Sequence, residues 1–268
     1  MLVVVRGAGD IASGIAVRLH RSGASIVMLD VAVPTSVRRT VCFSEAVRLG
    51  EAEVEGIRAV RCESASEAAK VAATGTIAVL VDPKGESIPK LAPEAVIDAI
   101  LAKENLGTTK DMAPVVIGVG PGFHAGESSN ADCHAAIETK RGHYLGRVIY
   151  DGSPIPNTGV PGKHWWLHHR TRAARAGRRP LRAHRKDWRP GQEGRPRGQG
   201  LWRAPLRNHR RRASRPSPGG LPRHQGHEVR RHRPALQVGH CFSVSDKARA
   251  VGGGVLEALL HFSHRLEG

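Results

Sequence analysis

The order of hydrophobic and polar positions predicts alternating strands and helices over the first 160 residues. Residues 2–5 form an apolar, β-branched run, residues 11–21 carry apolar side chains at helical spacing, and residues 25–31 are apolar again. A glycine-containing turn separates the first run from the second. This succession is typical of the strand, turn, helix and strand that begin an α/β fold.

Further apolar runs continue the pattern. Residues 76–81 and 114–119 are interpreted as buried strands, and residues 135–139 as another strand-like segment. Residues 93–103, which a proline opens, are interpreted as a helix. Buried strands separated by helices predict a Rossmann-like, mostly parallel sheet with helices on both faces.

A last apolar stretch, residues 243–266, is interpreted as a C-terminal helix. Ser245 or Asp246 can cap its first turn, and the glycines at 252–254 are expected to interrupt it. A glycine run ahead of a helix start can bind an anion. Close packing onto the sheet is the favoured use of these glycines.

The turn after the first strand matches a variant of the dinucleotide-binding fingerprint, Gly7-x-Gly9-x-x-Ala12. In this fingerprint Gly7 permits the tight turn, Gly9 lets a pyrophosphate approach the backbone, and Ala12 allows close helix packing. Asp30 lies about 20 residues beyond the turn, where a carboxylate can reach a ribose hydroxyl. We therefore predict nucleotide binding at Gly7, Gly9, Asp10, Ala12 and Asp30, although the same turn also serves simply to build the fold.

Charged residues beside the turn leave alternatives open. Asp10 stands at the helix start, where its carboxylate can cap the helix and would repel a phosphate. Arg38 and Arg39, just past the second strand, are candidates for binding a phosphate or another anion. A solvated loop is an equal alternative for both arginines.

Two later turns are also candidates. In doubly wound sheets, ligands bind outside the carboxyl ends of the strands. Asp82, Gly120 and Gly122 therefore share the rim of the first turn if their strands are parallel neighbours. Gly120 and Gly122 are assigned to cofactor binding, with a tight turn as the alternative. Arg141 and His143 could polarise a ligand, and a structural role is the favoured alternative for the histidine.

Five sequence motifs follow one another along the chain. They are RGAGDIASG (6–14), PTSVRRTVCFSEAV (34–47), NLGT (105–108), APVVIGVGPGF (113–123) and IETKRGH (137–143). Together they resemble the selenium-dependent molybdenum hydroxylase system protein family, also called the YqeB family. The resemblance covers residues 1–162 and resumes at residues 238–254. It departs at residues 128–133, which are longer and more polar than the usual turn of the family.

The resemblance implies a Rossmann-like domain and an accessory role in the maturation of molybdenum hydroxylases or in selenium handling. It implies a molybdenum hydroxylase as the partner enzyme. It supplies no agreed reaction, so no catalytic residue is assigned. Only the nucleotide-type turn carries over to this sequence, at Gly7, Gly9 and Ala12 together with Asp30.

Charge changes the picture over one segment. The chain has 41 Lys+Arg, 24 Asp+Glu and a formal net charge of +17, which taken alone favours a nucleic-acid binder. Residues 163–237 carry a net charge of +19, and the rest of the chain carries −2. This segment holds all four tryptophans and no Ile, Phe, Tyr, Met or Cys, so it is expected to be disordered.

The genetic code indicates that this segment is read out of frame. Trp has the single codon TGG, so Trp165-Trp166-Leu167 read one nucleotide later gives Gly-Gly, and the neighbouring codons admit the family string IGGYTTER. The same shift admits KIGDxVKKG at residues 186–194 and MKCGDIDP at residues 227–234. Three compatible strings between in-frame family sequence favour a compensated frameshift.

The chain is therefore divided into a Rossmann-like domain at 1–162, the Arg-rich segment at 163–237 and a C-terminal segment at 238–268. The four cysteines have no paired metal or redox spacing, and no metal site is expected. No leader pattern and no run of 18 apolar residues is present, so a cytoplasmic protein without a membrane span is expected.

The leading functional hypothesis is an accessory protein, more plausibly non-catalytic than an enzyme, that holds NAD(P) or a molybdopterin nucleotide. An NAD(P)-dependent oxidoreductase is the first alternative, but Asp82, His124 and His143 form no recognisable acid–base set. An Arg-rich nucleic-acid binder is the second, and no specific nucleic-acid partner is expected because an out-of-frame segment would bind polyanions nonspecifically.

The frameshift predicts a result at the DNA level. Resequencing across the codons for Gly162 and Gln237 should reveal a single-nucleotide difference from close relatives at each boundary. Agreement with those relatives at both boundaries would show that the segment is encoded as written.

Overall fold

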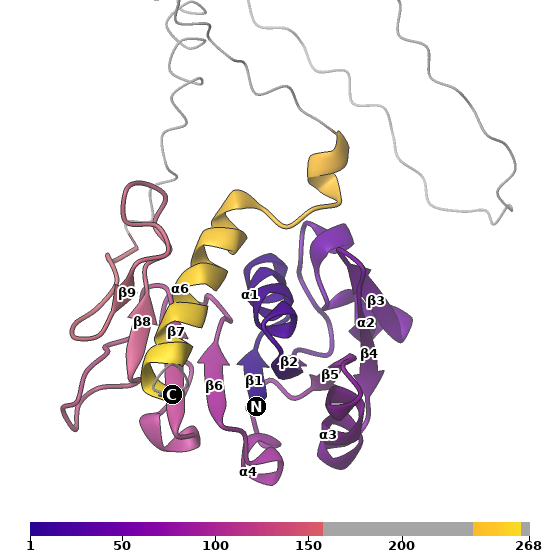
Figure 1. Cartoon of the computed structure of the whole chain (residues 1–268), viewed down its shortest axis with the longest axis horizontal. Coiled ribbons are helices and arrows are strands. Elements are labelled where there is room, and N and C mark those ends of the chain that lie inside the picture. Colours follow the sequence, from indigo (N-terminus) through magenta and orange to yellow (C-terminus); the bar gives the residue numbers. More distant parts are fainter. Residues whose placement is uncertain (158–237, 264–268) are drawn as a thin grey trace, which may run out of the picture. The chain divides into compact units, whose positions relative to one another are not determined.

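A twisted sheet forms the centre of the computed structural model, which describes residues 1–157 and 238–263 (Figure 1). In these residues the sheet has nine strands in the order β3-β4-β5-β2-β1-β6-β7-β8-β9. The strands are β1 Leu2–Arg6, β2 Ser25–Asp30, β3 Glu51–Val54, β4 Ile57–Cys62, β5 Ile77–Val81, β6 Ala95–Asp98, β7 Val115–Val119, β8 Ala135–Ile137 and β9 Val148–Ile149.

The predicted Rossmann-like parallel sheet is confirmed. Seven neighbouring strands, from β4 to β8 in the sheet order, run parallel, and β3 and β9 are antiparallel strands at the two edges. Numbered along the chain, the six strands β5-β2-β1-β6-β7-β8 have the Rossmann order 3-2-1-4-5-6. The order reverses between β1 and β6, which makes their carboxyl ends the topological switch point where such folds bind ligands.

Helices cover both faces of the sheet. One face packs against α1, α2 and α6, and alternate strand residues such as Val3 and Val5 point into this layer. The other face packs against α3 and α4, and Val4 points into that layer. The helices are α1 Asp10–Arg21, α2 Glu45–Leu49, α3 Ala65–Ala73, α4 Ile88–Leu91 and α6 Asp246–Ser263, and short 3-10 turns occur at Arg39–Val41, Lys110–Met112 and Val238–Cys241.

The C-terminal helix α6 lies beside α1 on the same face of the sheet (Figure 1). Glycines allow the two helices to approach closely, because a Cβ added to Gly14 would lie 2.5 Å from Ala248 Cβ. A Cβ added to Gly252 would lie 3.2 Å from the Gly14 carbonyl oxygen. The C-terminal segment is therefore packed into the same unit as residues 1–157.

Two expectations about these elements were wrong. Residues 93–103 do not form a helix, because Ala95–Asp98 is strand β6, buried between β1 and β7. A short apolar run looks the same in a buried strand as in a buried helix, so periodicity could not separate them. The glycines at 252–254 do not interrupt α6, which is continuous from Asp246 to Ser263. Two of them, Gly252 and Gly254, pack closely against the backbone of Gly14 and Gly146.

The cap predicted at the start of α6 is confirmed. The Ser245 hydroxyl oxygen accepts the Ala248 N–H at 3.2 Å and so caps α6. Cys42, Cys62, Cys133 and Cys241 are free thiols. Among the described residues, no group of His, Cys, Asp or Glu could hold a metal ion, and no helix has the length and apolar character needed to cross a bilayer. The Arg-rich segment 163–237 lies outside the described residues.

Candidate functional site

The turn after β1 requires glycine at its first fingerprint position. Gly7 has φ +97°, a left-handed conformation that side chains with a Cβ rarely adopt. A Cβ on Gly7 would lie 2.9 Å from the Ala99 carbonyl oxygen, on the loop after β6. The Gly7 N–H donates to the Leu29 carbonyl at 2.6 Å. The backbone conformation and the packing against Ala99 therefore explain why this position requires a glycine.

The second fingerprint glycine is different, because the protein leaves space at that position. Gly9, which precedes α1, has φ −72° and ψ −173°, an extended conformation open to any residue. A Cβ on Gly9 would have one neighbour within 4 Å, the Ser36 hydroxyl at 3.5 Å. The described part of the protein thus leaves room beside the backbone of Gly9. Ala12, at the third position, is buried.

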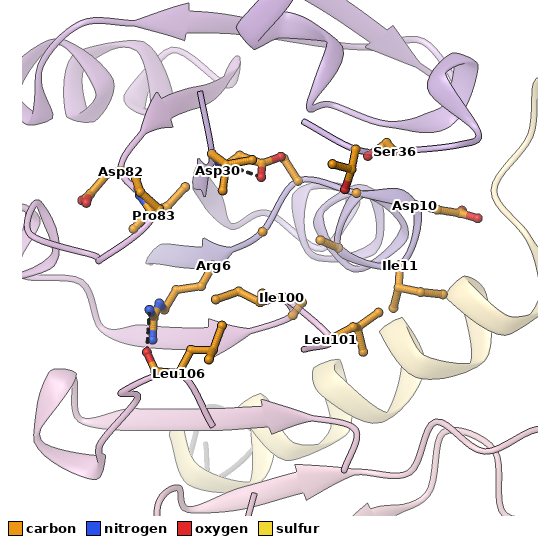
Figure 2. Close-up of a pocket in the computed structure, with 18 residues that line it drawn as sticks. Arg6, Asp10, Ile11, Asp30, Ser36, Asp82, Pro83, Ile100, Leu101 and Leu106 are labelled. Atoms are coloured by element: carbon orange, nitrogen blue, oxygen red, sulfur yellow. Dashed lines mark hydrogen bonds between the residues drawn. The ribbon is translucent and has the colours of Figure 1, made fainter. Parts of the chain in front are cut away.

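A cavity of about 360 Å³ lies at the switch point, in the range of small-molecule sites (Figure 2). It is bounded by the glycine turn, the end of β2, the loop after β5 and the loop after β6. The structure brings Gly7, Gly9, Asp10, Ala12, Asp30 and Asp82 together around this cavity. Arg6, Ser36, Pro83, Ile100, Leu101 and Leu106 are among its other lining residues.

Asp30 is the acidic residue at the end of β2. Its carboxylate accepts the Val31 N–H at 2.8 Å and a further hydrogen bond from the Ala8 N–H. Burial raises the pKa of Asp30 above its usual range, and these two hydrogen bonds offset part of the increase. A half-buried carboxylate at the cavity can accept hydrogen bonds from ligand hydroxyls.

Asp82 also lines the cavity, but its oxygens already bind the chain. They accept N–H groups of Gly85, Glu86 and Ser87 at 2.7–3.0 Å and the Ser87 hydroxyl at 2.6 Å. Burial alone would raise the pKa of Asp82, but these hydrogen bonds outweigh it and hold the pKa below its usual value. Asp82 therefore organises the loop that leads into α4.

Asp10 is paired with Arg38 rather than capping α1. Arg38 Nη1 lies 2.9 Å and 3.1 Å from the two Asp10 carboxylate oxygens. The Asp10 side chain points away from the other labelled residues (Figure 2). Arg38 Nη2 also donates to the carbonyls of His240 and Ser243, at 2.7 Å and 2.9 Å. The arginine thus offsets the charge of Asp10 beside the turn. Arg39 is mostly exposed and lies 3.8 Å from Glu45.

A buried ion pair fixes the two strands that flank the switch point. Arg6, at the end of β1, and Asp98, at the end of β6, are each 2% exposed, and Arg6 Nη1 lies 3.3 Å from Asp98 Oδ2. The Thr108 hydroxyl accepts a hydrogen bond from Arg6 and donates one to Asp98 at 2.6 Å. Arg6 Nη2 donates to the Leu106 carbonyl at 3.3 Å. Sequence reasoning did not single out these residues, although the quoted motifs contain Arg6, Leu106 and Thr108.

The segment after β2 holds the glycine turn in place. The Ser13 hydroxyl donates to the Ala8 carbonyl at 3.0 Å and accepts the Phe43 N–H at 2.8 Å. The Ser44 N–H donates to the same Ala8 carbonyl at 2.9 Å. Phe43 is fully buried. These contacts join two of the sequence motifs and place the turn against the core.

The remaining candidates lie away from this cavity's lining. Gly120 and Gly122, after β7, have positive φ, and a Cβ on Gly122 would lie 2.5 Å from Glu104 Cα. Arg141 pairs with Asp246 at 2.8 Å and lowers the pKa of that carboxyl to about 2. His124 Nδ1 lies 3.2 Å from the Ser153 hydroxyl, and His143 stacks edge-on with Tyr144. Neither histidine is among the residues that line the switch-point cavity.

Comparison with known proteins identifies the family. In an alignment 271 positions long, which covers 98% of this chain, the sequence is 46% identical to the uncharacterized protein YqeB of Escherichia coli (strain K12). The chain belongs to the YqeB family. It spans about half the length of that relative, 48% of it. No family model matches the chain, and no solved structure matches it.

In this YqeB-family chain the motifs meet around the same cavity. The glycine turn forms one wall, and the motif at residues 34–47 supports that wall. The motif at residues 105–108 contributes Thr108, which hydrogen-bonds both partners of the buried ion pair. Asn105 Nδ2 donates to the Thr108 carbonyl at 2.8 Å, and the Thr108 N–H donates back to Asn105 Oδ1 at 2.7 Å. Residues that lie far apart in the sequence thus meet around one cavity.

Breaking the buried pair should unfold the chain more easily. Asp98→Asn leaves the Arg6 charge buried without its counterion, so we expect a loss of about 3–5 kcal/mol in the free energy of unfolding. Urea denaturation followed by circular dichroism measures it. Asp111→Asn, at an exposed position, is the matched control and should change stability by less than about 0.5 kcal/mol. Equal, small effects of the two substitutions would contradict the structural role of the pair.

Proposed function

We propose that the chain is an accessory protein of selenium-dependent molybdenum hydroxylases that holds a nucleotide or a nucleotide-bearing cofactor at the switch-point cavity. NAD(P) and a molybdopterin nucleotide are the candidate cofactors. The observation that carries the proposal is the space beside Gly9. The protein's own packing does not require a glycine there, and the start of α1 opens onto the cavity at that point.

The residues present fit a nucleotide. The first N–H groups of α1 have no partner within the helix and can donate to a pyrophosphate. The carboxylate of Asp10 would repel that anion, but Arg38 forms an ion pair with this carboxylate and offsets its charge. The Asp10 side chain also points away from the other labelled residues of the cavity (Figure 2). Asp30 stands where it can accept a hydrogen bond from a ribose hydroxyl. Ile100, Leu101 and Leu106 supply apolar surface for a base or ring.

The residues around the cavity are better suited to binding a cofactor than to catalysing a reaction with it. The described residues that line it include no Lys, His, Cys or Tyr, the usual groups for proton transfer besides carboxylates. Of the three carboxylates, Asp82 is held by four hydrogen-bond donors and Asp10 by Arg38. Asp30 accepts two backbone N–H groups and is the carboxylate assigned to a ribose hydroxyl. These observations favour an accessory role over the alternative of an NAD(P)-dependent oxidoreductase. The link to molybdenum hydroxylases, and to selenium, rests on the family resemblance.

Filling the space beside Gly9 should abolish nucleotide binding without unfolding the protein. In Gly9→Ala the new Cβ contacts only Ser36 among the described residues, so the free energy of unfolding should change by less than about 1 kcal/mol. The methyl group would stand where the phosphates approach, so affinity should fall at least about tenfold. Isothermal titration of the full chain with NAD, NADP and a molybdopterin dinucleotide measures this loss.

Gly253→Ala is the matched control for this titration. An added Cβ at Gly253 has no neighbour within 4 Å, and the position lies within α6, far along the chain from the turn. Its affinity should equal that of the unmodified chain. If none of the three ligands binds the unmodified chain, the cofactor-holding function is wrong. If they bind Gly9→Ala as tightly as the unmodified chain, they bind elsewhere.

A further inference from the structure

A second and larger cavity adjoins the start of α1. It has a volume of about 920 Å³ and shares only Asp10 and Ile11 with the switch-point cavity. Its other lining residues come from the loop after β2, the turn after β8 and the C-terminal segment. They are Arg38, Arg141, Val238, His240, Cys241, Ser243, Val244, Ser245, Asp246, Lys247 and Arg249.

Three of the four cations in this lining already have carboxylate partners. Arg38 pairs with Asp10, Arg141 with Asp246, and Arg249 with Glu55 at 2.6 Å. Pairing removes most of their attraction for another anion. A positive charge that can attract a further anion must therefore come from another residue of the lining.

Lys247 is the cation that lacks such a partner. Its ammonium group makes no ion pair or hydrogen bond within the described residues, and the side chain is half-buried. Burial lowers the pKa of Lys247, and the nearby charge of Arg141 adds to this effect. The nearby carboxylate of Glu138 is committed to the N–H groups of Lys140 and Ile155, at 2.6 Å and 2.8 Å. The charges of Glu138 and Asp246 raise the pKa of Lys247 and so oppose this shift, but among the described residues neither carboxylate forms a direct ion pair with the ammonium. A partly desolvated ammonium without a direct ion pair is stabilised further when an anion binds.

A hydroxyl group in the same lining belongs to Ser245, two positions before Lys247 in the sequence. Ser245 also lines the cavity, and its oxygen accepts the Ala248 N–H at 3.2 Å. A hydroxyl that accepts one hydrogen bond can still donate its own hydrogen. The ammonium and the hydroxyl together match a tetrahedral oxyanion, which offers several acceptor oxygens and a full negative charge.

We propose that this second cavity binds an oxyanion of the phosphate type. The Lys247 ammonium supplies the positive charge that attracts the anion, and the Ser245 hydroxyl supplies a further hydrogen-bond donor. The anion belongs to a small molecule separate from the nucleotide of the first cavity. Because the two cavities meet at Asp10 and Ile11, a bound phosphomonoester would lie next to the nucleotide turn. This site does not depend on nucleotide binding at Gly9.

Protection of Lys247 from acetylation tests the site locally. The full chain is treated briefly with dilute acetic anhydride, with inorganic phosphate or with chloride at equal ionic strength, and each lysine is followed by peptide mass spectrometry. At a phosphate concentration ten times the dissociation constant, labelling of Lys247 should slow about tenfold. Lys70, exposed on α3, should label at the same rate in both salts. Unchanged labelling of Lys247, or equal slowing of both lysines, would overturn the proposal.

Two substitutions separate this site from the others. In Gly9→Ala the protection of Lys247 by phosphate should persist, and its loss would assign the anion to the nucleotide site instead. The phosphate-dependent rise in melting temperature should fall by at least half in Lys247→Gln and stay unchanged in Lys70→Gln. These two variants lose the same charge, so anion binding by the Arg-rich segment contributes equally to both. An equal rise in both variants would also overturn the proposal.

Discussion

A buried ion pair at the topological switch point is the interaction on which the rest of the structure depends. Arg6 and Asp98 end the two strands where the order of the sheet reverses, and both are almost completely buried. Such a pair contributes little net stability, but leaving either charge alone is costly. Thr108 satisfies both partners, which fixes the loop after β6 against the end of β1. The cavity between them takes its shape from this arrangement.

The glycine turn depends on the same loop. The Ala99 carbonyl lies so close to Gly7 that a side chain there would collide with it. Ser13 and Ser44 fix the other side of the turn through the Ala8 carbonyl. The turn is therefore held from both directions before any ligand binds. Such preorganisation lowers the entropic cost of ordering a binding site.

The C-terminal segment is joined to this site although nearly 90 residues separate it from β9. Arg38 bonds Asp10 and also the carbonyls of His240 and Ser243, so the start of α1 and the start of α6 share one guanidinium. Close helix packing at Gly14 and Gly252 continues the contact along α1. Both proposed sites therefore border elements that this segment stabilises.

The sequence was sufficient to predict the parallel sheet, the glycine turn and the position of Asp30, because local patterns determine these features. It was not sufficient for β6, since four buried residues carry no periodicity that separates a strand from a helix. It also missed the pairing of Arg6 with Asp98, which lie 92 positions apart and meet only through the order of the strands. The glycines of α6 were misread because Gly252 and Gly254 pack against Gly14 and Gly146, which lie more than 100 positions away in the sequence.

The most direct test of the central claim is to locate the nucleotide on the full chain. Amide resonances of a ¹⁵N-labelled sample, followed during titration with NAD or a molybdopterin dinucleotide, report which N–H groups meet the ligand. The account predicts that the largest shifts occur at Gly9, Ile11 and Ala12 and at Ala8 and Val31 beside the Asp30 carboxylate. Saturable binding that leaves these amides unshifted would contradict the account.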